Sequence, residues 1–316
     1  MMLSWGGSQW PVLTRKESHD VRDLNETNVT EAVLGQMHAS DPRLQTLLES
    51  LVRHLHAFVR EVEVTEDEWL GAIRFLTAVG QISDDKRQEF ILLSDVLGVS
   101  ILVDAINHRK LSGGTESTVT GPFWVSGAPE MAHGAMIARG EEAVAGEITS
   151  VHGRVIDEEG RPIEGAVLDV WQASPAGMYD VQDPDQPEMN LRGIFRSGEG
   201  GEFWFKTVKP AAYPIPDDGP VGELLKATGR HPMRPAHIHF MVRASGYKPL
   251  TTHIFVEGDP YLESDAVFGV KDSLVVNFDW NYSKDEAARF GLEAPFIDVA
   301  FEIVLESGRK GPGITG

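Results

Sequence analysis

Apolar residues recur with a helical period over roughly the first 110 positions. One predicted amphipathic helix presents an apolar face made of Leu44, Leu47, Leu48, Leu51 and Leu55. A second is expected around Trp69, Ile73 and Leu76, because the run Thr65-Glu66-Asp67-Glu68 before it has the form of a capping box. A third, roughly Asp84 to Arg109, is apolar on more than one side and is therefore expected to be buried.

The period changes to two after a loop-rich stretch from Ser112 to Gly146. Short strands separated by Gly, Pro and Asp turns are expected at Glu147–Ile156, Ala166–Gln172, Glu202–Val208, Ala236–Val242, Thr252–Val256, Asp272–Phe278 and Ile297–Leu305. Strands of this length and spacing are typical of a β-sandwich. The predicted fold is therefore α+β, with a helical linker or dimerisation domain over 1–112 and a mixed-topology β-sandwich domain over 113–316.

Composition narrows the possible partners and metals. The chain has 316 residues, 28 basic and 48 acidic, and its net charge of −20 argues against binding to nucleic acid or an anionic membrane surface. It contains no cysteine, so any metal must be held by nitrogen and oxygen atoms. The segment Met1–Trp10 lacks the features of a secretory leader, and no apolar run reaches the roughly 18 residues that suggest a membrane span. These features predict a cytoplasmic protein.

Two histidines in the run Arg234-Pro235-Ala236-His237-Ile238-His239-Phe240 carry the first chemical signal. Residues i and i+2 of a strand point to the same face, so His237 and His239 have a chelating geometry. The carboxylate that a cupin site or a ferrous facial triad requires is missing, and there is no His-Glu-x-x-His helix. The pair could equally be ordinary polar residues on a half-exposed strand.

Tyrosine could supply the remaining oxygen donors. Tyr179 and Tyr213 are two of only five tyrosines, and both lie in turn-like Gly- or Pro-rich settings. A phenol with a pKa near 10 coordinates as phenolate only to a strong Lewis acid such as ferric iron. Two imidazoles and two phenols would suit that ion, although each tyrosine considered alone could be a packing residue.

Several motifs together give the chain a close resemblance to the intradiol ring-cleavage dioxygenases, extending from the N-terminal helices to about Leu305. The segments that carry it are Gly121-Pro122-Phe123-Trp124, Asp169-Val170-Trp171-Gln172-Ala173, Gly177-Met178-Tyr179, Tyr213-Pro214-Ile215-Pro216, Arg234 to His239, and Leu250-Thr251-Thr252-His253-Ile254-Phe255. The resemblance implies one non-haem Fe(III) per subunit, ligated by Tyr179, Tyr213, His237 and His239. It also implies catalytic roles for Tyr213, which would leave the metal and take up a substrate proton, and for Arg234, which would stabilise negative charge on the ring. A surface arginine at a strand start is the alternative for Arg234.

Within that family the chain most resembles the enzymes that cleave hydroxyquinol, 1,2,4-trihydroxybenzene, to 3-hydroxy-cis,cis-muconate or maleylacetate with O2. Asp95 stands in an otherwise apolar helical stretch, one turn from Leu92, and could accept a hydrogen bond from a third ring hydroxyl. It could instead cap a kink or pair with a basic residue such as Arg109. The other positions matching the family's substrate pocket, most of which could equally be core, are Leu92, Val119, Gly121, Pro122, Phe123, Ile215, Pro216, Arg234, His253 and Val267.

Two other functions stay open from the sequence. A catechol or chlorocatechol 1,2-dioxygenase would share the fold and the metal ligands, whereas a non-catalytic β-sandwich binding module would share only the strands. The expected partners are a small aromatic diol or triol and O2. The leucine face suggests a homodimer through the N-terminal helices, and the family resemblance implies that a phospholipid can lie between the subunits.

Overall fold

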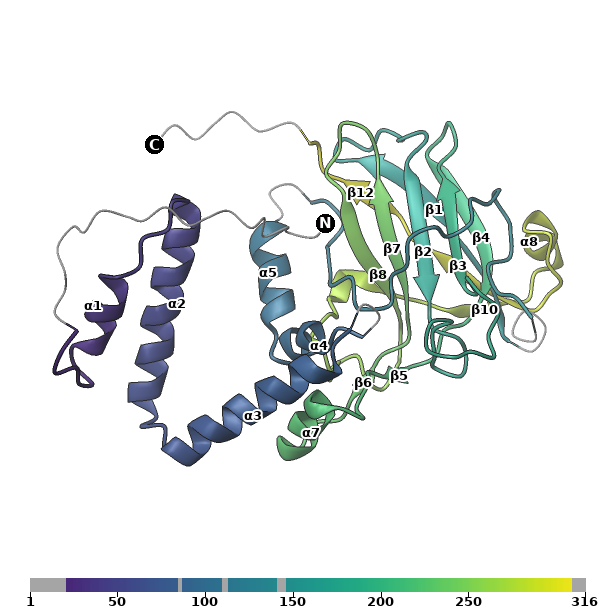
Figure 1. The fold of residues 1–316 in the computed structure, drawn as a ribbon. Helices are drawn as coiled ribbons and strands as arrows, with labels where there is room; N and C mark the ends of the chain where they lie inside the picture. Colours follow the sequence, from purple (N-terminus) through teal and green to yellow (C-terminus); the bar gives the residue numbers. More distant parts are fainter. Residues whose placement is uncertain (1–20, 85–86, 110–112, 141–145, 309–316) are drawn as a thin grey trace. The chain divides into compact units, whose positions relative to one another are not determined.

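The computed structural model describes residues 21–84, 87–109, 113–140 and 146–308 (Figure 1). The segment Met1–Trp10, on which the leader prediction rests, lies outside them. The chain forms two compact units, 1–76 and 77–316. The division into functional domains at residue 112 stays a prediction.

The first unit is helical, as predicted. It contains α1 (Val29–Leu34), α2 (Pro42–Glu61) and the start of α3 (Glu66–Ile82). The predicted capping box is present, because the Thr65 hydroxyl accepts from the Glu68 backbone N–H at 3.3 Å and the Glu68 carboxylate accepts from the Thr65 N–H at 2.9 Å. No residue of α2 is buried, and its leucine face is about half exposed at Leu47 (50%) and Leu55 (52%).

The third predicted helix is wrong in extent and in burial. The structure has two helices there, α4 (Glu89–Val96) and α5 (Val99–Asn107), separated at Gly98, whose φ of 71° is in the left-handed region that breaks an α-helix. Helix α4 buries Leu92 and Val96, but α5 exposes most of its apolar side chains, including Leu102 at 58%. Periodicity cannot distinguish one buried helix from two helices with different surroundings.

The second unit contains the predicted β-sandwich, with mixed strand directions (Figure 1). One sheet has the order β10-β11-β1-β12, with β4 also paired to β1, and its strands are β1 (Ile148–Asp157), β4 (Glu202–Val208), β10 (Asp279–Asn281), β11 (Phe296–Ala300) and β12 (Ile303–Leu305). The other has the order β3-β2-β7-β8-β9, formed by β2 (Val167–Gln172), β3 (Arg192–Arg196), β7 (His237–Arg243), β8 (Leu250–Val256) and β9 (Val275–Val276). A two-stranded ladder joins β5 (Tyr213–Pro214) to β6 (Met233–Arg234), and the short helices α7 (Pro220–Ala227) and α8 (Lys284–Arg289) lie in connections.

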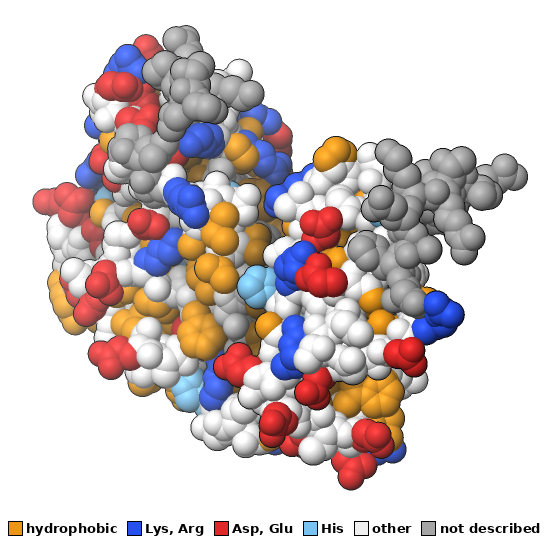
Figure 2. Space-filling model, turned by 90° about the vertical axis from the view of Figure 1, so that its left-hand side faces the viewer, with side chains coloured by type: hydrophobic (Ala, Val, Ile, Leu, Met, Phe, Trp, Pro, Cys, Tyr) orange, Lys and Arg blue, Asp and Glu red, His pale blue; other side chains and the backbone are white. Residues whose placement is uncertain are grey.

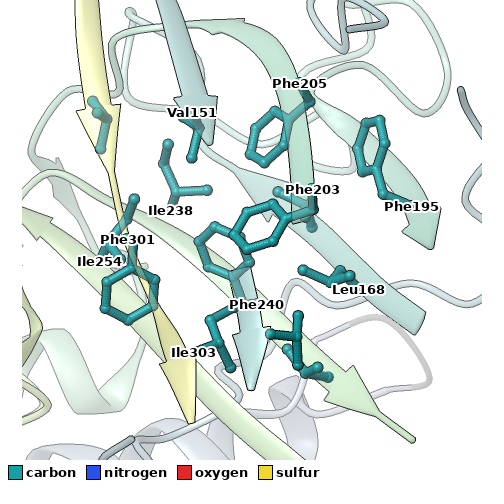
Figure 3. Close-up of a cluster of buried hydrophobic side chains, with 14 of the residues drawn as sticks. Val151, Leu168, Phe195, Phe203, Phe205, Ile238, Phe240, Ile254, Phe301 and Ile303 are labelled. Carbon is teal, nitrogen blue, oxygen red and sulfur yellow. The ribbon is translucent and has the colours of Figure 1, made fainter. Parts of the chain in front are cut away.

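The core between the two sheets fixes which way β7 faces. Side chains such as Val151, Phe203 and Phe205 from one sheet point toward those of the other, including Leu168 and Phe240 (Figure 3). Because successive residues of a strand point to opposite faces, burying Ile238 and Phe240 in this core turns His237 and His239 to the other face of the sheet. The sandwich core therefore presents both histidines on a single surface.

Several strand boundaries differ from the sequence-based expectations. Strand β3 was not predicted, and the run Asp272–Phe278 forms only a 3-10 turn (Asp272–Leu274) followed by β9. The run Ile297–Leu305 is two strands, which pair with β1 before and after Gly153, where a Cβ atom would lie 1.8 Å from the Phe301 carbonyl oxygen. Among the described residues, no helix is both long and apolar enough to cross a bilayer.

Candidate metal centre and substrate cavity

Sheet register brings three buried histidines together on the outer face of the second sheet. His239 is directly opposite His253 in the β7–β8 ladder, and His237 is two residues before His239. The Nε2 atoms of His237 and His239 are 3.1 Å apart, and one ring nitrogen from each of the three histidines lies within 4.8 Å of the others. All three are at most 1% exposed. This cluster could hold a metal ion.

Two tyrosines join this cluster from separate segments. Tyr213 on β5 is directly opposite Arg234 on β6. Because β6 leads into β7, the pairing of β5 with β6 places Tyr213 beside the histidines. Tyr179 ends a tight turn in which Gly177 has a φ of 80°, and a Cβ atom there would lie 3.2 Å from that of Tyr213. The hydroxyl of Tyr179 is 3.2 Å from that of Tyr213 and 3.0 Å from His239 Nε2.

These four donor atoms fit one cation. Ligands at adjacent positions around an ion, each about 2 Å from it, are separated by about 3 Å, which is close to the 3.0–3.2 Å spacings observed here. His237 donates its Nδ1–H to the Pro235 carbonyl at 2.7 Å, which leaves the Nε2 lone pair facing the cluster. The second nitrogen of His239, Nδ1, is buried without a hydrogen-bond partner among the described residues.

Burial sets the protonation of the donors. It lowers the pKa of His237, to about 3, with a further contribution from the Arg234 charge, and so keeps that imidazole neutral. Burial and the neighbouring Tyr213 raise the pKa of Tyr179 well above its usual 10.0. A phenolate at Tyr179 therefore requires a strongly Lewis-acidic cation in the cluster, which is the type of ion that this donor set suits.

Arg234 lies beside this cluster and is only 2% exposed. Its NH1 donates to the Tyr213 hydroxyl at 3.3 Å and to His237 Nε2 at 3.2 Å. Its Nε donates to the Asp265 carboxylate at 3.1 Å. Burial alone would lower the pKa of Arg234, but the charge and hydrogen bond of Asp265, together with the neighbouring Tyr213 and Tyr179, outweigh burial and the pKa rises, so the guanidinium is permanently charged. Arg234 is thus a fixed cation rather than the surface arginine considered as an alternative.

His253 is part of the histidine cluster and does not line the large cavity described below. Its ring stacks on that of His237 with centroids 4.6 Å apart and meets the ring of His239 edge-on at 4.0 Å. Neither of its ring nitrogens has a hydrogen-bond partner among the residues that the structure describes. Burial, followed by the neighbouring His237, lowers its pKa well below the ordinary value, so His253 is a neutral imidazole beside the candidate ligands.

A cavity of about 970 Å³ lies beside the cluster. Its lining includes five of the predicted substrate-binding residues, Leu92, Pro122, Phe123, Ile215 and Pro216. Phe123 stacks on Tyr179 with ring centroids 4.7 Å apart, and Pro214 follows Tyr213 directly, so the cavity wall continues into the ligand cluster.

The remaining predicted pocket residues do not line this cavity. They are Asp95, Val119, Gly121, Arg234, His253 and Val267. A Cβ atom at Gly121 would lie 3.7 Å from the His239 ring, which places its backbone against the cluster. Val119 and Val267 are buried. Asp95 is 3% exposed on α4. Burial raises its pKa, as does the charge of Asp265, whereas a hydrogen bond from Ser100 and the charge of Arg234 lower it. No ion pair joins Asp95 to Arg109 in the described part of the chain.

Sequence reasoning missed several charged residues that surround this region. Asp265 holds Arg234, and Asp180, next to Tyr179, forms a buried ion pair with Arg192. Arg87 joins Glu89 and Asp218 at the cavity wall. Each pair connects residues far apart in the sequence except Arg87 and Glu89, and single charged residues in turns are typical of exposed loops. The sequence therefore carries no signal for these pairings.

Family models and known proteins similar to this chain agree with one another. Residues 119–307 match the family model described as Dioxygenase, and residues 41–115 match that of the catechol dioxygenase N terminus. The chain is 56% identical over 255 residues to a hydroxyquinol 1,2-dioxygenase of Rhizobium sp. (strain MTP-10005), covering 80% of this chain and 85% of that protein.

Two solved structures extend the comparison. Hydroxyquinol 1,2-dioxygenase from Pseudomonas putida DLL-E4 is similar with a TM-score of 0.83 and 52% identity, covering 89% of this chain and 98% of that one. Wild-type catechol 1,2-dioxygenase from Acinetobacter radioresistens is similar with a TM-score of 0.81 and 31% identity, covering 93% and 97%.

Proposed function

Because this chain belongs to the intradiol ring-cleavage dioxygenases, we propose that it cleaves hydroxyquinol with O2, giving 3-hydroxy-cis,cis-muconate, the enol form of maleylacetate. The observation that carries the proposal is the convergence of two phenol oxygens and two imidazole nitrogens beside a largely apolar cavity. The identity to enzymes named for hydroxyquinol is higher than that to the catechol enzyme, which favours hydroxyquinol as substrate.

Tyr179, Tyr213, His237 and His239 would hold one non-haem ferric ion per subunit. The chemistry that such an ion supplies is Lewis acidity, which lowers the pKa of the substrate hydroxyls and prepares the ring for reaction with O2. The burial of all four side chains keeps bulk water away from the donor atoms. The hydrogen bond from His237 Nδ1 to the Pro235 carbonyl fixes the orientation of the imidazole, so this ring needs no reorientation when a metal binds.

Tyr213 and Arg234 supply the proton and charge chemistry. Tyr213 Oη lies in the cluster, where it would accept a proton from a substrate hydroxyl, and Arg234 NH1, 3.3 Å away, donates a hydrogen bond to the same oxygen. The same guanidinium provides a fixed positive charge for negative charge that develops on the ring. In a dry site such a charge acts strongly and needs no reorganisation.

The third hydroxyl of hydroxyquinol distinguishes it from catechol, and Asp95 is the residue proposed to bind that hydroxyl. It lies one helical turn after Leu92, which lines the cavity, and its charge interacts with that of Arg234. The apolar residues Phe123, Ile215 and Pro216 would enclose the ring, with Val119, Gly121 and Val267 behind them. His253 would contact the substrate from the side of the histidine cluster.

A substrate panel tests this function. Iron-loaded protein should cleave hydroxyquinol with a kcat/KM at least 10²-fold above that for catechol or 4-chlorocatechol, because a site built around a hydroxyl discriminates by up to about 10⁴. It should also show a visible tyrosinate-to-iron charge-transfer band. Faster cleavage of catechol would favour the catechol alternative. A colourless protein that stays inactive after reconstitution with iron would instead favour a binding module.

We also propose a homodimer formed through the N-terminal helices. Helix α2 has no buried residue, and Leu47, Leu51, Leu55 and Phe58 on it are each at least half exposed. Exposed hydrophobic side chains are visible among the charged ones on the surface in Figure 2, and exposed apolar patches on a protein surface mark interaction sites. Light scattering should give twice the chain mass of 34.7 kDa. Mass spectrometry of an organic extract would show whether a phospholipid accompanies the dimer.

A further inference from the structure

The loop from Asp265 to Gly269 surrounds the Arg234 guanidinium. The Asp265 side chain is only 2% exposed, and its carboxylate accepts from Arg234 Nε at 3.1 Å and from Arg234 NH2 at 3.4 Å. It also accepts from the backbone N–H groups of Gly269 at 2.9 Å and Val267 at 3.3 Å. The loop's own backbone N–H groups therefore hold the carboxylate in place, independently of its contact with the arginine.

This arrangement decides where the third guanidinium nitrogen points. A guanidinium is planar and rigid, so fixing Nε and NH2 also fixes NH1. In the structure, NH1 is the nitrogen that reaches the Tyr213 hydroxyl and His237 Nε2. Movement of Asp265 would thus change the contact that Arg234 makes with the candidate ligands.

The loop itself is held by independent contacts. Arg230 donates to the carbonyls of Ala266, at 2.9 Å, and Val96, at 2.6 Å, and its guanidinium lies 4.8 Å from the centre of the Phe268 ring. Thr118 donates its hydroxyl to the Gly269 carbonyl at 2.9 Å. Phe268 adopts a φ of 59°, a conformation that bulky residues rarely take without support from their surroundings. These contacts leave the loop little freedom to relax.

Gly269 leaves room for this packing. A Cβ atom at this position would lie 3.0 Å from Thr118 Oγ1, 3.1 Å from Arg234 NH2 and 3.2 Å from Asp265 Oδ2. These distances are shorter than ordinary van der Waals contacts, so an added methyl group would displace the ion pair by a few tenths of an ångström. Substitution at Gly269 therefore perturbs the geometry of the ion pair between Asp265 and Arg234 while keeping the charges of both residues.

We propose that Asp265, supported by the loop 265–269, is a positioning residue that aims the Arg234 guanidinium at Tyr213. This inference rests on the proposed function, since it assigns the aimed group to ring cleavage. Within the described part of the chain, the Asp265 carboxylate makes no hydrogen bond to Tyr213 or to the histidines, and it acts through Arg234. The alternative is an ion pair that contributes only to folding.

The test compares Asp265→Asn and Gly269→Ala with wild type in the iron-loaded protein. Misplacing a catalytic group by about 1 Å costs about 10²-fold in rate, so Asp265→Asn should lower kcat for hydroxyquinol by about that factor while KM changes less than about threefold. Its visible band should shift, because Tyr213 loses an oriented donor. The smaller displacement in Gly269→Ala should lower kcat by about tenfold and shift the band in the same direction.

Asp298→Asn is the matched control. Asp298 is a partly buried carboxylate that contacts His152 and Asn281 and touches none of the site residues. Its kcat and band should equal those of wild type, whatever the change in thermal unfolding temperature. If wild type lacks both turnover and the band, the proposed function fails. If wild type has both, but each test variant that folds keeps kcat within twofold and an unshifted band, the positioning role is overturned.

Discussion

Replacing Asp95 with asparagine tests the choice of substrate. The side chain is 3% exposed on α4, which also carries the cavity residue Leu92. Burial raises the pKa of Asp95 above its ordinary value, while the Ser100 side chain and the Arg234 charge act in the opposite direction. Asparagine keeps the size of the side chain and removes its capacity to bind a hydroxyl as an anion.

The size of the effect follows from the strength of one hydrogen bond. A hydrogen bond to a charged group contributes about 1.5–3 kcal/mol. At about 1.4 kcal/mol per tenfold change, its loss lowers kcat/KM for hydroxyquinol by roughly 10- to 150-fold. Catechol has no third hydroxyl, so its kcat/KM should change little. The ratio of the two values should therefore fall by the same factor.

The assay measures the steady-state rate at which wild type and variant cleave each substrate, monitored through the absorbance of the ring-opened product. Asp104→Asn provides the control, because Asp104 is another buried aspartate on the neighbouring helix α5, and its partners His108, Ser117 and Lys271 do not line the cavity beside the cluster. It should leave the ratio unchanged. Equal losses on both substrates in Asp95→Asn would refute the assignment and return Asp95 to a structural role.

Two further predictions concern the surroundings of the cluster. Asp180→Asn breaks a buried pair with Arg192, whose side chain is 2% exposed; it should reduce the free energy of unfolding by about 3–5 kcal/mol, measured by urea denaturation. Glu223→Gln, which breaks the exposed pair with Lys226, should leave the free energy of unfolding nearly unchanged. Tyr179→Phe and Tyr213→Phe should each shift or abolish the visible band while far-ultraviolet circular dichroism stays unchanged; an unaltered band would remove that tyrosine from the ligand set.

Local signals predicted the fold well where local physics determines it. The capping box at Thr65 and the alternation along β7 were confirmed, because each depends on neighbours within a few residues. Strand β3 was missed because it starts at Arg192, which a reader of the sequence expects at the surface but which is buried against Asp180. The break between β11 and β12 depends on the close approach of Phe301 to Gly153, almost 150 positions away in the sequence.

The four candidate ligands could be proposed from sequence because they stand in recognisable motifs, the two histidines together in one and each tyrosine in another. Asp265 could not, since nothing near it distinguishes it from other acidic residues in a loop. Its importance arises only when the chain places it against Arg234, 31 residues earlier. Residues that position a catalytic group are harder to predict than the group itself, because their evidence is a pairwise contact and not a pattern.

The candidate metal cluster and the cavity beside it are built from different parts of the chain. The register of β7 with β8 and the β5–β6 ladder fix the histidines, Tyr213 and Arg234, and these follow from the sandwich core. The cavity adds Leu92 from α4 and Phe123 from a loop, which the sheets do not constrain. Changes on α4 can thus alter the accepted ring without disturbing the ligands. Enzymes of this fold can therefore share one reaction and differ in substrate, which is why Asp95, and not the histidines, should determine whether a third hydroxyl is required.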